Sequence, residues 1–401
     1  MSDGKRRILQ AGAPHDPAAA ADSRRDRRVH PSADGEVDDT RGSRGDAAPA
    51  RRARGTGGRR VRTDVRPIEG YDVVGDVHGH HDVLVRLLAR MDYVERDGVW
   101  RHPTRKAVFL GDLIDRGAHQ VETVRLVQRM IAAGEAQMVV GNHEFNAVAY
   151  ATEWPDRPGS YARPHDEKNL KQHRRFLEET DFGSPLHGEL IEWFCTIPLW
   201  LELELNGRRL RVVHACWNDG EMDVLREALG EGFTLTESAV LATSTRGSRE
   251  YQALELVLKG PEIDMGGRVY LDKGRHERRK ARLRWWNPQA RTLRDAALVP
   301  WNVTAPDGGA FAPLPDDPID MKHTYTSDVP VVVGHYWERP PAKLWSPKVA
   351  CVDYSVAARG ALGAYRWSGE RDLSIDNVVM VPTSDAEATD EPGEAGGPDT
   401  D

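Results

Sequence analysis

Five short apolar segments of this chain are each followed closely by a residue of a type that binds divalent cations. Segments of this length, ending at a glycine or a histidine, are typical of buried strands, and they lie at 71–74, 107–110, 137–140, 210–213 and 329–333. Helical spacing of apolar residues follows the first two, at 83–91 and 121–133, so the sequence predicts a layered α/β domain. In open α/β sheets functional side chains gather at the carboxyl ends of strands, where residues far apart in sequence can meet.

The residues that follow these strands form five motifs with related chemistry. They are Gly75-Asp76-Val77-His78-Gly79, Gly111-Asp112-Leu113-Ile114-Asp115-Arg116-Gly117, Gly141-Asn142-His143-Glu144, His214, and Gly334-His335. Carboxylate, imidazole and amide oxygen ligands suit Mn, Fe and Zn, and a bridging carboxylate can hold two ions about 3.5–4 Å apart. Each motif alone is more typical of an ordinary turn or helix start, but the five together predict a site for two metal ions.

The segments GDVHG, GDLIDRG and GNHE, followed by His214 and Gly334-His335, closely resemble the phosphoprotein phosphatase branch of the calcineurin-like metallophosphoesterase family. This branch includes bacterial members that hydrolyse diadenosine tetraphosphate. The resemblance implies the metallophosphoesterase fold, which is a β-sandwich of two mixed sheets flanked by helices.

The resemblance also implies a role for each motif residue. Asp76 and His78 would bind the first divalent ion, Asp112 would bridge both ions, and Asn142, His214 and His335 would bind the second. His143 would be the general acid that protonates the leaving oxygen, oriented by Asp115, and Arg116 would bind the phosphate. A positioned imidazole of this kind contributes about 10²–10⁴-fold to a rate.

The chain departs from the family pattern in three places. His214-Ala215-Cys216 replaces the usual His-Gly-Gly, and Gly334-His335-Tyr336-Trp337 lacks the second histidine of many other metallophosphoesterases. The single histidine favours the phosphatase branch over the nuclease and phosphodiesterase branches. A second phosphate-binding arginine is not evident, because the candidates Arg246, Arg249 and Arg275 are more typical of ordinary surface arginines.

Two long insertions interrupt the alternation of strands and helices, at about 153–209 and 218–328, and are expected to form a cap or wall near the site. Helices are predicted within them at 170–179, 190–194, 221–229 and 253–258. Near the end of the domain, 349–352 and 361–367 are predicted to be a closing pair of strands.

The ends of the chain differ in composition from its centre. Residues 1–66 are rich in arginine without apolar periodicity, and 384–401 carry acidic residues without lysine or arginine, so both are predicted to be disordered tails around a domain at 67–383. The three cysteines are scattered, and no apolar run approaches the ~20 residues of a membrane helix. The sequence therefore predicts a cytoplasmic protein without a membrane partner.

A basic run, Lys273 to Arg284, precedes Trp285 and Trp286. It could bind a polyanion or nucleotide, but a charged helix face with two tryptophans in the core is the favoured interpretation. The net charge of −8 gives no overall basic field, so a nucleic-acid partner is not expected.

The function expected from these observations is that of a serine/threonine-phosphatase-like metallophosphatase. It would use two divalent ions, with manganese expected and iron or zinc as alternatives, on a phosphoprotein or a nucleotide. One alternative is a dinucleoside polyphosphate hydrolase, and another is a nucleic-acid-binding protein with a regulatory phosphatase core.

Overall fold

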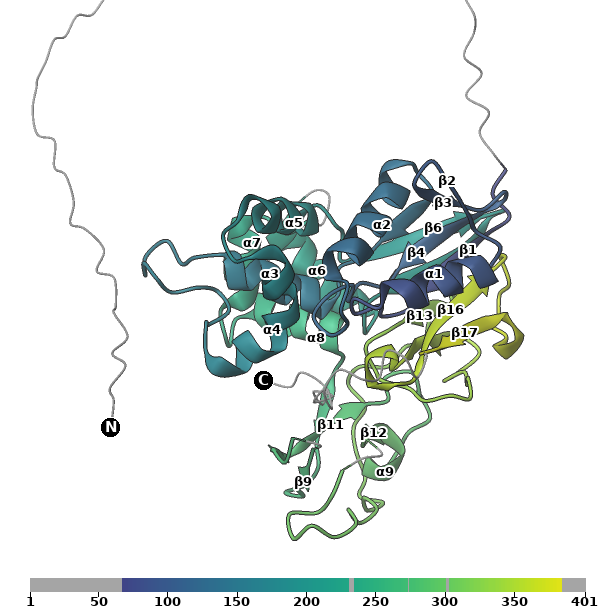
Figure 1. Ribbon diagram of the computed structural model, residues 1–401. Helices are drawn as coiled ribbons and strands as arrows, with labels where there is room; N and C mark the ends of the chain where they lie inside the picture. Colours follow the sequence, from purple (N-terminus) through teal and green to yellow (C-terminus); the bar gives the residue numbers. More distant parts are fainter. Residues whose placement is uncertain (1–66, 231–233, 273, 301–302, 384–401) are drawn as a thin grey trace, which may run out of the picture. The chain divides into compact units, whose positions relative to one another are not determined.

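The computed structural model describes residues 67–383 except 231–233, 273 and 301–302 (Figure 1). The predicted disordered tails, 1–66 and 384–401, lie outside the described residues. The domain boundaries therefore stay predictions, and the account below concerns the described residues alone.

The first three predicted strands lie side by side in a six-stranded mixed sheet. Strands β1 (Gly70–Val74), β4 (Arg105–Phe109) and β5 (Ala136–Met138) are parallel and adjacent in that order. On the other side of β1 the sheet continues antiparallel through β16 (Ala361–Trp367), which pairs with both β15 (Asp353–Tyr354) and β17 (Val378–Pro382). Because β1, β4 and β5 are parallel, the first three motifs begin at the same edge of this sheet.

A four-stranded mixed sheet carries the last two motifs. Its order is β14 (Val349–Cys351), β13 (Val331–Val333), β7 (Arg208–Val213) and β6 (Trp200–Leu205), and only β6 is antiparallel to its neighbour. His214 follows β7 and His335 follows β13 closely, so these two side chains also start from one edge.

The predicted pairing of 349–352 with 361–367 is wrong. Strand β14 pairs in parallel with β13, whereas β16 pairs with β1, so the two segments belong to different sheets. A strand that is buried on both faces is apolar throughout, so its sequence does not indicate which strand it pairs with. The closeness of two such segments in the sequence therefore does not predict that they pair.

One hydrophobic cluster has members from both sheets. Val73 and Val108 of the six-stranded sheet share it with Val212 and Val332 of the four-stranded sheet. The predicted α/β content with mixed sheets is confirmed, while the closed two-sheet sandwich stays a prediction. Helices α1 (His81–Arg90) and α2 (Gln120–Ala132), predicted from apolar spacing, bury their apolar faces in a second and larger cluster.

The insertions contain the predicted helices and several elements that were not predicted. Their helices are α4 (Glu167–Thr180), α5 (Pro185–Cys195), α6 (Asp219–Leu229), α7 (Glu237–Ser244) and α8 (Arg249–Lys259), while α3 (Asn142–Ala151) begins in the third motif and ends before the first insertion. Helix α3 contacts α5 and α7, and α8 contacts α6 and α7 (Figure 1). No helix in the described ranges has the length and apolar character to cross a bilayer, and the cytoplasmic location stays a prediction.

The rest of the second insertion consists of short strands and one short helix. They are β8 (Glu262–Asp264), β9 (Tyr270–Leu271), β10 (Glu277–Arg278), β11 (Lys280–Leu283), α9 (Leu293–Ala296) and β12 (Ala297–Leu298). The basic run was interpreted as a helix face, but it forms β10 and β11, and β11 pairs with β8 and β12. Trp285 and Trp286 are buried, as that interpretation expected. The remaining elements are β2 (Val94–Arg96), β3 (Val99–Arg101) and the 3₁₀ turns η1 (Val356–Ala358) and η2 (Ile375–Asn377).

A buried carboxylate joins three strands of the larger sheet. Asp72 of β1 is fully buried and accepts hydrogen bonds from Arg105 Nε of β4 at 2.8 Å and from Arg366 Nε of β16 at 3.2 Å. The hydroxyl of Tyr93 donates a third bond to it at 3.1 Å. This network fixes the strands that position the first two motifs.

We expect Asp72→Asn to lower the free energy of unfolding by about 3 kcal/mol or more, because it leaves a buried arginine without its counter-ion. Asp92→Asn is the matched control, since Asp92 also faces Arg366 but its side chain is 79% exposed. Urea unfolding followed by circular dichroism measures both. Equal, small losses in the two variants would contradict the structural role given to Asp72.

Candidate metal centre

The loops that follow the strands adopt backbone conformations that side chains rarely take. His78 has a φ of 50°, Asp112 a φ of 50° and His335 a φ of 70°, all in the left-handed region. Such conformations cost about 1–3 kcal/mol each and cluster at functional sites, where the surrounding structure holds them. The surrounding structure, and not the backbone preference of these residues, therefore sets the direction of the three side chains.

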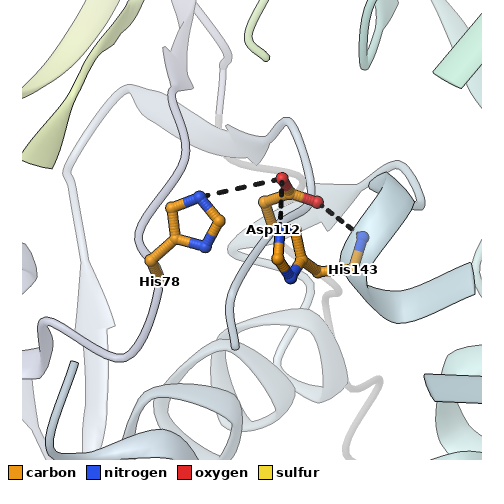
Figure 2. Close-up of side chains that lie close together, drawn as sticks. All are labelled: His78, Asp112 and His143. Atoms are coloured by element: carbon orange, nitrogen blue, oxygen red, sulfur yellow. Dashed lines mark hydrogen bonds and ion pairs between the residues drawn. The ribbon is translucent and has the colours of Figure 1, made fainter. Parts of the chain in front are cut away.

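The Asp112 carboxylate lies at the centre of the predicted site. Its Oδ2 atom is 3.4 Å from His214 Nε2, 3.8 Å from His78 Nε2 and 3.9 Å from His143 Nε2. Figure 2 shows His78 and His143 approaching this carboxylate from different segments. Two groups of buried side chains could each hold a cation: Asp112 with His78 and His143, and Asp112 with His214 and His335.

Backbone carbonyl groups orient two of these histidines. His78 Nδ1 lies 2.9 Å from the carbonyl oxygen of Ile114, and His214 Nδ1 lies 2.7 Å from that of Leu110. Because a carbonyl can only accept, each Nδ1 donates, and Nε2 is the nitrogen that faces Asp112. Metal-binding histidines commonly have this arrangement.

Asn142 lies between two more of the predicted ligands. Its Oδ1 atom is 2.9 Å from His214 Nε2 and 2.9 Å from His335 Nδ1. It is the first residue of α3, whose preceding residue Gly141 is the helix N-cap. The start of this helix therefore brings the Asn142 amide to the ends of β7 and β13.

Asp76 lies beside these side chains. Among the described residues, it is a member of neither of the two groups that could hold a cation. Its Oδ2 accepts a hydrogen bond from the backbone N–H of His335 at 3.0 Å, while Oδ1 is buried and has no hydrogen-bond partner within the described ranges. Burial raises the pKa of Asp76 well above its usual range, and Asp353 and Asp112 add to the rise. A buried carboxylate oxygen without a partner is costly unless it binds a cation, so this residue fits a metal ligand.

The charges at Asp112 and His78 also suit metal binding. Burial alone would raise the pKa of Asp112, but the imidazoles of His214 and His143 outweigh it and hold this pKa well below its usual range. Burial, with His143 and Arg116 nearby, lowers the pKa of His78 to about 3. The carboxylate is therefore ionised and the His78 ring neutral near pH 7, the states in which both bind cations.

His143 and Asp115 form a buried pair next to Asp112. His143 Nδ1 is 2.6 Å from Asp115 Oδ2, and both side chains are almost fully buried. With Nδ1 directed to Asp115, the Nε2 atom faces Asp112 at 3.9 Å. These distances allow His143 either to bind an ion or to deliver a proton, so its role as general acid stays a prediction.

Two arginines lie at the site, and only one of them was expected. Arg116 has a buried Nε that finds no hydrogen-bond partner in the part of the chain that the structure describes, and its Cζ lies 6.0 Å from the ring centre of Trp337. Arg282 of β11 is buried, and its Nη2 lies 2.9 Å from His335 Nε2. Sequence reasoning missed Arg282, and the basic run that contains it was the only signal.

The three arginines that were considered as a second phosphate ligand are exposed, as expected of ordinary surface arginines. They are Arg246, Arg249 and Arg275. Arg249 pairs with Glu221 on the surface.

Arg282 can only donate, so His335 Nε2 accepts and Nδ1 carries the proton in this arrangement. To bind an ion through Nδ1, His335 would therefore need a change of tautomer together with a shift of Arg282.

Comparison with known proteins agrees with the motifs. Residues 71–226 match the calcineurin-like phosphoesterase family. An asymmetrical bis(5'-nucleosyl)-tetraphosphatase PrpE of Halalkalibacterium halodurans is 43% identical over 74 residues, which are 18% of this chain and 30% of that protein. A symmetrical bis(5'-nucleosyl)-tetraphosphatase of Haemophilus influenzae is 32% identical over 132 residues, which are 33% of this chain and 39% of that protein.

A solved protein serine/threonine phosphatase of Saccharomyces cerevisiae aligns with 80% of this chain and 81% of its own, with 13% identity and a TM-score of 0.40. The matched segments span only 30% to 39% of the two curated relatives. The family resemblance predicted from the motifs is confirmed for residues 71–226, which match the calcineurin-like phosphoesterases.

Proposed function

We propose that this protein is a phosphoester hydrolase with two divalent ions, of which Asp112 is the shared ligand. The observation that carries the proposal is the membership of Asp112 in both groups of side chains that could hold a cation. A carboxylate common to two such groups is the arrangement expected of a bridging ligand.

The remaining ligands divide between the two ions in our proposal. Asp76 and His78 would hold one ion, and Asn142, His214 and His335 would hold the other. The mixture of nitrogen and oxygen atoms favours manganese, with iron or zinc as alternatives, over magnesium, which prefers oxygen ligands. Ions held in this way polarise a phosphoryl group and make a nucleophilic water available near neutral pH.

His143 would supply the proton that the leaving oxygen needs. Asp115 accepts from Nδ1 and so keeps Nε2 turned toward Asp112, where the reacting phosphate would be bound. Arg116 would bind phosphate oxygens, since its guanidinium has a buried Nε without a partner and carries a planar set of donors. These residues bind, orient and protonate, while the ions supply the Lewis acid.

For the substrate we propose a dinucleoside polyphosphate. The support is the similarity to two proteins that are named bis(5'-nucleosyl)-tetraphosphatases. Phosphoserine or phosphothreonine in a protein is the second candidate, favoured by the single histidine in Gly334-His335-Tyr336-Trp337. The nucleic-acid-binding alternative has less support, because in the basic run Arg278 pairs with Asp272 and Arg279 with Glu277.

The experiment that tests the function is a panel of hydrolysis assays with added manganese. It compares diadenosine tetraphosphate, a phosphothreonine peptide and p-nitrophenyl phosphate, before and after prolonged dialysis against a chelator. We expect hydrolysis that disappears with chelator and returns with manganese better than with magnesium. Folded protein that hydrolyses none of the three compounds, or all of them after complete metal removal, would refute the proposal.

A pair of variants separates a metal ligand from a proton donor. Asp112→Asn should lose both metal content and rate, because it removes the shared charge. His143→Asn should keep its metal and lose on the order of 10²–10⁴-fold in kcat, with the greater loss for leaving groups of high pKa. Elemental analysis and a series of aryl phosphates measure the two effects, and loss of metal from His143→Asn would mean that His143 is a ligand.

Gly334 offers a second test of the Asp76 position. A Cβ atom there would lie 2.1 Å from Asp76 Oδ1, so Gly334→Ala must displace the carboxylate. We expect it to lower metal content and to reduce activity on the order of 10²-fold, as misplacements of about 1 Å do. Gly188→Ala is the control, since a Cβ at Gly188 meets nothing within 4 Å. Unchanged metal content in Gly334→Ala would remove Asp76 from the ligand set.

A further inference from the structure

A second histidine contacts the Asp115 carboxylate from outside the five motifs. His173 lies in α4, within the insertion at about 153–209, and its side chain is 4% exposed. Its Nδ1 is 2.7 Å from Asp115 Oδ1, while His143 Nδ1 is 2.6 Å from Asp115 Oδ2. Each oxygen of one buried carboxylate is therefore bonded to a different imidazole.

The surroundings of His173 decide which of its nitrogen atoms carries the proton. Its ring stacks on Phe176 at 5.0 Å and lies 5.4 Å from the ring of Tyr150. Its Nε2 is buried and has no hydrogen-bond partner among the described residues. A proton on Nε2 would be left without an acceptor, so the Nδ1–H tautomer, which donates to Asp115, is the favoured one.

Helix α4 is fastened to the same loop at a second point. Glu179, near the end of α4, accepts hydrogen bonds from the backbone N–H groups of Gln120 and Val121 at 2.7 and 2.9 Å. The side chain of Gln120 in turn accepts from the backbone N–H of Asp115 at 2.6 Å. The insertion helix therefore holds both the backbone and the carboxylate of the Asp115 loop.

We propose that His173 is a positioning residue for phosphoester hydrolysis, which acts through Asp115 on His143. This inference rests on the function proposed above. The hydrogen bond from His173 to Oδ1 holds the Asp115 carboxylate in one orientation. In that orientation Oδ2 faces His143. By holding Asp115 in this way, His173 also fixes the direction of His143 Nε2, the nitrogen from which the leaving oxygen would take its proton.

The test uses His173→Phe, which keeps a ring of similar size against Phe176 but cannot donate a hydrogen bond. We expect its kcat to fall roughly tenfold with phenyl phosphate, whose leaving group needs a proton, and less than about twofold with p-nitrophenyl phosphate. KM and manganese content should not change. His173→Asn should recover most of the rate, because its amide nitrogen can donate from nearly the position of Nδ1.

His187→Phe is the matched control. His187 is also a buried histidine of the insertion, its Nε2 has no hydrogen-bond partner among the described residues, and its ring centre lies 5.9 Å from that of Phe176. In the described part of the chain it forms no hydrogen bond or ion pair with Asp115, so it should not alter the dependence on the leaving group. An equal effect of both variants on both compounds would show that His173 has only a packing role.

A double-mutant cycle tests the route of the effect. If His173 acts through His143, then adding His173→Phe to His143→Asn should cause no further loss with phenyl phosphate. Additive losses would overturn the proposal.

The tautomer of His173 gives a test that needs no variant. In ¹⁵N NMR spectra of the wild-type protein, His173 should be protonated on Nδ1, and a proton on Nε2 alone would also overturn the proposal. This measurement decides the case if His173→Phe does not fold. Wild-type protein that is inactive on both phosphates would instead refute the proposed function, whichever tautomer His173 has.

Discussion

The ionised carboxylate of Asp112 is the constraint on which the rest of the site depends. A buried carboxylate is strongly unfavourable unless charges and hydrogen-bond donors surround it. Here the backbone N–H of His143 donates to Oδ1 at 3.0 Å, and His214 Nε2 lies 3.4 Å from Oδ2. The rings of His78 and His143 lie beside the same oxygen atom. Four separate segments therefore lie within a few ångströms of one side chain. They are the loops that follow β1, β4 and β7 and the start of α3.

Glu144 shows how the loop that carries Asp112 is held in its unfavourable conformation. Its carboxylate accepts hydrogen bonds from the backbone N–H groups of Asp112 and Leu113, both at 2.7 Å, and of Gly141 at 3.1 Å. Burial, together with the nearby Asp112, raises the pKa of Glu144 to about 7. Glu144, the last residue of the Gly-Asn-His-Glu motif, therefore holds the backbone of the second motif. Its role is to support the Asp112 loop.

The sequence predicted the parts of the site that begin at strand ends, and the reason is geometric. An apolar segment followed by Asp, Asn or His can be recognised locally, and parallel strands place such ends at one edge without further information. His173 and Arg282 could not be recognised in this way, because each lies within an insertion helix or strand with no motif around it. The pairing of β14 and β16 was wrong for a related reason, since an apolar segment buried on both faces does not reveal its partner.

His173 and Arg282 contact different ends of the same site. His173 of α4 reaches Asp115, and through it His143, whereas Arg282 of β11 reaches His335. Both contacts come from the insertions, and each falls on the atom that the motif neighbour does not contact: His143 contacts the other oxygen of Asp115, and Asn142 contacts the other nitrogen of His335. The motif residues can supply the ligands and the proton donor, but their orientation requires partners that the strand ends alone do not contain. Changes in the insertions can therefore alter the tautomer and orientation of the site residues while every motif stays the same.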